Sequence, residues 1–165
     1  MKPSGRAAPL VAELQAFLER GVSVMVGTRD ADLVPELIRA WGPRFGRDRR
    51  SMSLCVARPG SARTLANLRD NGRLAVTCAL PLDSHAIQIW GRCLGTAPAN
   101  REDLSAVQTH RDAFARSNAS IGVPRPFVEA LWQRELAGSP ALVRIRFAAE
   151  QIFNQTPGPG AGSAL

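Results

Sequence analysis

The sequence SMSLCVARPGSARTLANLRDNGRLAVTCAL, residues 51–80, decides how this chain folds. It begins and ends with apolar, β-branched stretches that are typical of strands, at 51–57 and 73–80. Between them, the spacing of leucines predicts a short helix over 61–71, which Gly72 ends. A strand, a turn, a short helix and a second strand therefore form the centre of the predicted fold.

The turn that leads into this helix gathers groups that bind phosphate. The first helical turn offers backbone N–H groups without intrahelical partners, and arginine makes two-pronged contacts with phosphate oxygens. Serine is also an ordinary N-cap residue, so a capped turn with solvated arginines fits the same pattern. Both interpretations stay open on this segment alone. The side chains concerned are Arg58, Ser61, Arg63 and Thr64.

Periodicity predicts the remaining elements around this centre. Several short strands joined by turns favour an antiparallel barrel over a wound parallel sheet. We expect one α+β domain, residues 1–165, built on six antiparallel strands with flanking helices, and with flexible or extended tails at 1–7 and 156–165. Gly91 and Gly95 are expected bend points, and Pro35 should lie at a sheet edge or a bulge. The other expected segments are helices over 8–20, 100–117 and 126–137, strands over 22–28, 33–41, 85–97 and 140–150, and a basic loop over 42–50.

The net charge of +7 is concentrated in one part of the chain. Nine arginines and two aspartates lie between Arg39 and Arg73. Such a patch attracts nucleotide phosphates, phosphorylated metabolites or nucleic acid. Nucleic-acid surfaces usually interleave aromatic side chains with the basic ones, and the patch contains only Trp41 and Phe45. A small anionic ligand is therefore favoured over nucleic acid.

Several classes of protein are excluded by what the sequence lacks. No run of about 18 apolar residues occurs and the N-terminus has no apolar signal region, so we expect no membrane span and a cytoplasmic location. Cys55, Cys78 and Cys93 form no C-x-x-C pair and indicate reduced core thiols rather than a metal site. No Ser-His-Asp set, paired carboxylate arrangement or P-loop occurs, which agrees with chemistry that resides in a cofactor rather than in side chains.

Four motifs occur in a specific order along the chain. They are V-M-V-G-T-R-D at 24–30, V-P-E-L-I-R-A-W-G at 34–42, G-S-A-R-T-L-A-N-L-R-D-N-G-R-L-A-V at 60–76 and H-A-I-Q-I-W-G at 85–91. This order resembles the pyridoxamine 5'-phosphate oxidase-like, FMN-binding split-barrel proteins. The resemblance implies a split barrel, a homodimer and FMN bound between the two subunits.

The resemblance also implies which residues hold the cofactor phosphate. By position, Arg39 takes the place of a basic residue on the second strand. Arg63, with Ser61 beside it, takes the place of a Ser-Arg-Lys cluster before the helix, and Thr64 stands where the lysine usually lies. The C-terminal arginine motif of true pyridoxamine phosphate oxidases has no match, so vitamin B6 oxidation is not implied.

The ring environment of the flavin is less closely matched. Ala86 stands where a flavin-facing glutamine would be, and His85 or Gln88 would have to compensate. Aromatic faces suit a flat heterocycle, but tryptophans at such positions are also ordinary core residues. The candidates for the ring environment are Thr28, Trp41, His85, Gln88 and Trp90.

Two functions follow from the resemblance. The first is a flavin-dependent oxidoreductase, in which FMN carries hydride or electrons, with a deazaflavin or haem as other cofactors. The second is a non-enzymatic dimeric module that binds flavin or another anionic ligand on the same barrel. The sequence specifies neither catalytic residues, nor a substrate, nor an electron donor.

Overall fold

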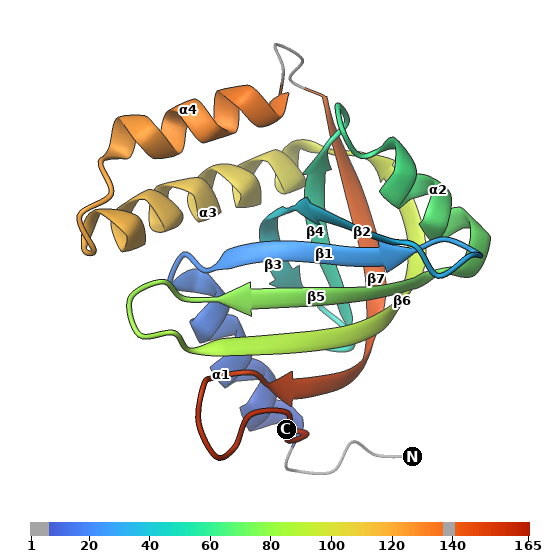
Figure 1. Ribbon diagram of the computed structural model, residues 1–165, viewed down its shortest axis with the longest axis horizontal. Helices are drawn as coiled ribbons and strands as arrows, with labels where there is room; N and C mark the ends of the chain where they lie inside the picture. Colours follow the sequence, from blue (N-terminus) through green and yellow to red (C-terminus); the bar gives the residue numbers. More distant parts are fainter. Residues whose placement is uncertain (1–6, 137–140) are drawn as a thin grey trace.

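The computed structural model describes residues 7–136 and 141–165. Its four helices and seven strands, in the part of the chain that the structure describes, follow one another in an α+β order without regular alternation (Figure 1). The elements are α1 (Ala7–Glu19), β1 (Ser23–Arg29), β2 (Pro35–Arg39), β3 (Trp41–Phe45), β4 (Ser51–Ala57), α2 (Ala62–Asn71), β5 (Arg73–Ala79), β6 (Ala86–Pro98), α3 (Arg101–Ala119), α4 (Arg125–Leu136) and β7 (Leu142–Asn154).

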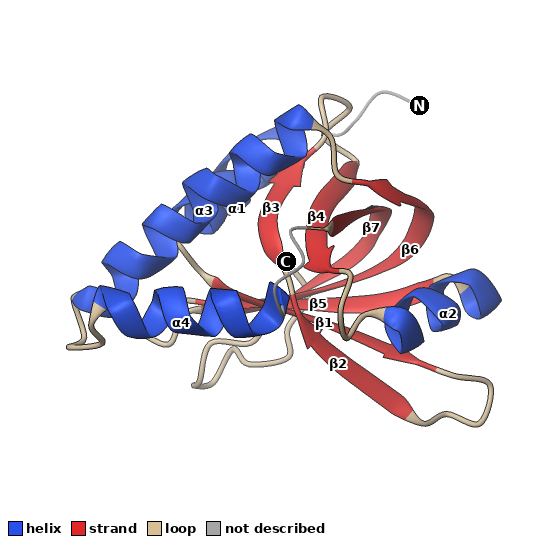
Figure 2. Ribbon diagram, turned by 90° about the horizontal axis from the view of Figure 1, so that it is seen from above, coloured by secondary structure: helices blue, strands red, loops and turns tan. Residues whose placement is uncertain are grey.

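All pairings in the sheet are antiparallel, in the strand order β2-β1-β5-β6-β7-β4-β3. The sheet is strongly curled, with α2 on one side and α3 and α4 together on the other (Figure 2). The predicted antiparallel barrel with flanking helices is therefore confirmed. The described residues contribute seven strands to it rather than six.

The additional strand corrects the prediction for residues 42–50. We expected a basic loop there, but β3 continues from Trp41 to Phe45 and pairs with β4. The expected strand over 33–41 is accordingly divided at Ala40 into β2 and β3, which lie at opposite edges of the sheet. Trp41 explains the division, because its side chain is buried beneath α3 and α4 and directs the chain away from β2.

The bending of β6 depends on its glycines. The register between β6 and β7 shifts at Trp90/Gly91 and again at Cys93/Gly95, as predicted for bulges. A Cβ atom built on Gly91 would lie 2.4 Å from the carbonyl oxygen of Ala148. Gly91 therefore lets β6 and β7 approach closely where the sheet turns.

Two clusters of buried side chains make up the core. The larger one fills the barrel, and the smaller one lies between the sheet and the pair α3 and α4. The largest fully buried members of the barrel cluster include Phe147, Leu18, Met52, Ile89 and Ile145. The helical cluster is built on Trp41, Phe114, Val128 and Trp132.

The three cysteines form no disulfide. Cys55 and Cys78 are fully buried, and burial raises the pKa of each thiol to about 12. No helix among the described residues is long and apolar enough to cross a membrane.

The structure describes the predicted C-terminal tail, residues 156–165, but not most of the predicted N-terminal tail. Residues 1–6 of the predicted N-terminal tail lie outside the described residues, and α1 begins at residue 7. The C-terminal segment turns back along β7. The Asn154 amide donates to the Ser163 carbonyl at 2.9 Å, and the Leu165 amide donates to the Ile152 carbonyl at 2.9 Å.

Candidate functional site

A cavity of about 460 Å³ opens between the end of β2, the turn after β4 and the last turns of α4. In Figure 2, the C-terminal end of α4 approaches the point where β2 and β4 come together. Arg39 and the turn that enters α2, two regions proposed from the sequence to meet, thus share one cavity, called the Arg39 cavity below. It is lined by Ile38, Arg39, Ala57, Pro59, Gly60, Leu131, Arg134 and Glu135.

Arg39 is held in this cavity by contacts from three elements. Its Nε lies 2.8 Å from Oε1 of Glu135, and its Nη1 donates to the Ser23 hydroxyl at 3.2 Å. The guanidinium carbon also lies 5.8 Å from the centre of the Phe114 ring, within cation–π range. A single carboxylate therefore neutralises an otherwise well-placed anion-binding group.

Glu135 is itself fixed by a second contact. Its Oε2 accepts a hydrogen bond of 2.7 Å from the indole Nε1 of Trp41. Burial raises the pKa of Glu135 above its ordinary value, while the Trp41 and Arg39 contacts oppose the shift. The Trp41 ring packs edge-to-face against Phe114 and Trp132 and is 1% exposed. Trp41 thus belongs to the helical core cluster and acts on the cavity through Glu135.

The turn before α2 has the expected backbone but different side-chain contacts. Ser61 is the N-cap residue, yet its hydroxyl donates to the Arg58 carbonyl at 3.0 Å and does not cap the helix. The Arg58 side chain is exposed. The Thr64 hydroxyl, in the first turn of α2, is buried without a hydrogen-bond partner among the described residues. The first turn of α2 therefore keeps its N–H donors free of a side-chain cap.

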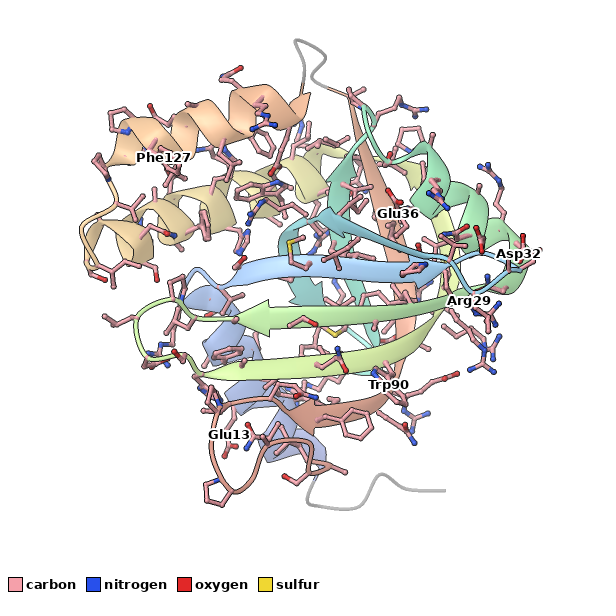
Figure 3. The ribbon with its side chains drawn as sticks, viewed as in Figure 1. Glu13, Arg29, Asp32, Glu36, Trp90 and Phe127 are labelled. Carbon is pink, nitrogen blue, oxygen red and sulfur yellow. The ribbon has the colours of Figure 1, made fainter. Side chains whose placement is uncertain are left out.

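Arg63 points away from this turn, toward the hairpin of β1 and β2. It forms exposed ion pairs with Asp30 at 3.4 Å and Glu36 at 3.8 Å. Glu36 and the nearby hairpin residue Asp32 are labelled in Figure 3. The structure therefore places Arg63 outside the lining of the Arg39 cavity.

The other sequence candidates lie on or near the sheet strands β1 and β6. Trp90 is 48% exposed on the outer face, its Nε1 donates to Gln88 at 2.9 Å, and its ring packs on Phe153 at 4.8 Å (Figure 3). Thr28 is buried and accepts a hydrogen bond of 3.1 Å from Asn67.

His85 is held near α1, with its ring 4.4 Å from that of Phe17. The backbone amide of the adjacent Ala86 donates to the Thr156 hydroxyl at 3.1 Å. This connects the start of β6 to the C-terminal segment. His85 therefore does not join the Arg39 cavity.

Trp90 and Thr28 line a second cavity of about 610 Å³ on the outer face of β1, β5 and β6. Its floor is a row in register across three strands, where Gly27 pairs with Ala75 and Ala75 with Trp90. Small side chains in this row leave a shallow groove beside the Trp90 ring. Arg29 and Arg73 stand at its rim.

Arg134 and Glu135 were missed in the sequence analysis. They are consecutive charged residues near the end of α4, where such a pair ordinarily belongs to a solvated helix face. Nothing in their local pattern distinguishes them from other charged helix residues. Their role depends on α4 packing over the sheet, which brings them beside Arg39.

No protein-family model and no curated protein sequence matches this chain. Several solved structures share its fold, among them the following three. An FMN-binding protein from Syntrophomonas wolfei has a TM-score of 0.56 and 12% identity, over 90% of this chain and 88% of the other. A protein titled F420 Reductase has a TM-score of 0.52 and 14% identity, over 84% and 94%. A Clostridium acetobutylicum protein, described as related to general stress protein 26 and of the pyridoxinephosphate oxidase family, has a TM-score of 0.51 and 13% identity, over 90% and 89%.

These likenesses confirm the resemblance to the pyridoxamine 5'-phosphate oxidase-like split barrels at the level of the fold. Whether the residues present fit a flavin phosphate is a separate question. Arg39 and Arg134 provide two cations in one cavity, and the turn into α2 borders it through Gly60. The Thr64 hydroxyl, in the first turn of α2, has no hydrogen-bond partner among the described residues, but it is buried and does not line this cavity. Two arginines beside a glycine turn suit a phosphomonoester, and among the described lining residues Glu135 is the opposing charge.

Proposed function

We propose that this chain binds FMN with the phosphate in the Arg39 cavity and acts as a flavin-dependent oxidoreductase. The observation that carries the proposal is the meeting of Arg39, from β2, with the turn that enters α2, in a cavity that also holds Arg134. The names of the structural neighbours, an FMN-binding protein and an F420 reductase, support a cofactor of the flavin type.

In this proposal the protein's own residues bind and orient the cofactor. Arg39 and Arg134 neutralise the phosphate, and the uncapped N–H groups of the first turn of α2 donate to its oxygens. Bound FMN supplies hydride or electron transfer. The proposal assigns no acid–base role to a side chain of this chain.

We further propose that two copies of the chain associate through the outer face of the sheet and complete the flavin site. Leu37 and Trp90 are 64% and 48% exposed on that face, and Gly27 and Ala75 lie between them in register. A flat apolar strip of this kind is typical of an association surface. The variant Leu37→Asp should then be monomeric by light scattering, whereas Leu104→Asp, at an exposed leucine of α3, should keep the dimer.

The experiment that tests cofactor binding compares two arginines. Arg39→Gln removes a charged donor from the cavity, and Arg116→Gln removes the same charge from an exposed position on α3. A charge-assisted hydrogen bond contributes about 1.5–3 kcal/mol, so Arg39→Gln should weaken FMN binding about 10- to 100-fold. Flavin fluorescence titration measures the affinity, and riboflavin, which lacks the phosphate, should bind both variants equally.

Two results would contradict this proposal. One is a purified protein that shows no flavin absorbance and gains no thermal stability from added FMN. The other is an equal loss of FMN affinity in Arg39→Gln and Arg116→Gln. The non-enzymatic module remains the second candidate, because Ala86 provides no polar side chain where a glutamine would face the flavin. Bound flavin without oxidation of a reduced nicotinamide in the presence of an acceptor dye would favour the module.

A further inference from the structure

We propose that Glu135 is a built-in competitor for the cofactor phosphate, whose carboxylate pairs with Arg39 until a strongly charged ligand replaces it. This inference rests on the proposed function, because it concerns the same cavity. It assigns to α4 a role in ligand specificity.

The contacts of Glu135 make it an ordered competitor. One carboxylate oxygen lies 2.8 Å from Arg39 Nε, and the other accepts the Trp41 indole N–H at 2.7 Å. The Glu135 side chain is 19% exposed and that of Arg39 is 25% exposed, so water screens the pair only partly. Dissolved anions replace an exposed ion pair easily. A ligand must instead compete with this partly buried pair to reach Arg39.

The balance of charge explains what can displace it. The lining of the cavity includes two cations, Arg39 and Arg134, and one anion, Glu135. A phosphomonoester carries close to two negative charges at neutral pH and three strong acceptor oxygens. A carboxylate ligand brings only as much charge as Glu135 already supplies. We therefore expect the cavity to bind phosphomonoesters more tightly than singly charged anions, which offer Arg39 no more charge than Glu135 does.

The Trp41 indole is in direct contact with Glu135 and can report its displacement. The indole N–H contacts Oε2, the oxygen that does not face Arg39 Nε. Trp41 is buried against Phe114 and Trp132, so its nitrogen has a fixed position. Release of Glu135 from Arg39 therefore changes the environment of the Trp41 indole, and this change can be observed directly.

The test uses a charge-free replacement of nearly equal shape. Glu135→Gln removes the negative charge and keeps an oxygen that can accept from Trp41. Glu129→Gln, on the same helix, removes the same charge from an exposed pair with Arg125 and is the matched control. In fluorescence titrations with FMN, Glu135→Gln should bind at least tenfold more tightly than the unaltered protein, and Glu129→Gln should bind equally. Riboflavin affinity should be unchanged in both.

A second measurement does not depend on affinity. The chain has three tryptophans, so its ¹H–¹⁵N spectrum has three indole signals, and Trp41→Phe identifies the one from Trp41. Addition of FMN to the unaltered protein should shift this signal. The double variant Arg39→Gln/Glu135→Gln removes both charges of the ion pair, and thermal unfolding of each single variant beside it shows whether a loss of affinity comes from misfolding.

The possible outcomes separate the two proposals. If the unaltered protein and Glu135→Gln bind FMN equally, or the variant binds more weakly, and the Trp41 signal does not move, the competitor role is wrong and the proposed function stands. If neither protein binds FMN at millimolar concentration, the proposed function fails and the competitor role fails with it. Binding by Glu135→Gln that exceeds binding by the unaltered protein supports both.

Discussion

Replacing Asp103 by asparagine should destabilise this protein more than any exposed charge change on the same helix. The Asp103 side chain is completely buried, and it accepts from Arg44 Nη2 at 2.6 Å and from the Asn100 amide at 2.8 Å. It also lies 3.5 Å from Arg144 Nη1. Asparagine can keep the bond to Asn100, so the substitution removes mainly the charge that faces two arginines.

Removing one partner of a buried ion pair costs about 3–5 kcal/mol. Both arginines are partly reached by water, with 21% of the Arg44 side chain and 31% of the Arg144 side chain exposed, so the lower value of about 3 kcal/mol applies. For a chain of this size, that loss lowers the melting temperature by about 6–12 °C. Calorimetry or circular dichroism measures it, with the exposed Asp112→Asn as control, whose melting temperature should be almost unchanged.

The double variant Asp103→Asn/Arg44→Gln tests whether the pair itself causes the loss. Its unfolding free energy should fall by less than the sum of the two single losses, because residues in contact are coupled. An equal, small effect of Asp103→Asn and Asp112→Asn would refute the reasoning. Strict additivity in the double variant would also refute it.

Two further predictions concern the buried residues His110 and Gly91. Burial lowers the pKa of His110 to about 4, below its unfolded value of about 6.5. The contribution of the neutral His110 ring to the free energy of unfolding is therefore complete above pH 6.5. It decreases by about 1.4 kcal/mol per pH unit as the pH falls toward 4. Urea unfolding between pH 4.5 and 7.5 should show this slope, and His110→Gln should flatten it. Gly91→Ala should cost about 1–3 kcal/mol, because the new Cβ meets the Ala148 carbonyl. Gly27→Ala, whose nearest neighbour is 3.7 Å away, should be tolerated, and equal melting temperatures for the two variants would contradict the close approach of β6 and β7.

Most strands were predictable because their burial alternates residue by residue. Val24, Val26, Val76 and Cys78 point into the barrel, and their neighbours along β1 and β5 point out, as the pattern of apolar residues indicates. The segment that became β3 has no such pattern, since Gly42 and Pro43 are typical of a loop. Contacts far along the chain hold it as a strand: the Gly42 amide donates to His110, and Arg44 pairs with Asp103.

The same distinction between local pattern and long-range contact applies to the candidate site. A backbone feature such as the turn into α2 follows from local residue types, and the turn lies where the sequence predicts it. A charged side chain is different, because its role depends on which partner the fold brings to it. Arg63 follows its helix toward the hairpin acids Asp30 and Glu36, although its place in the motif indicates a phosphate ligand.

Arg39 shows why an arginine alone cannot identify a ligand. The resemblance implies that Arg39 on β2 contacts the cofactor phosphate, but the anion that the described chain places against it is Glu135. That carboxylate is 94 residues from Trp41, the strand residue that fixes it, so no local pattern connects them. In the proposed site, an external phosphate shares the Arg39 guanidinium with this internal partner. If the proposed site binds phosphate, we expect its affinity to depend on the competition of the ligand and Glu135 for the Arg39 guanidinium, and Glu135→Gln tests this expectation.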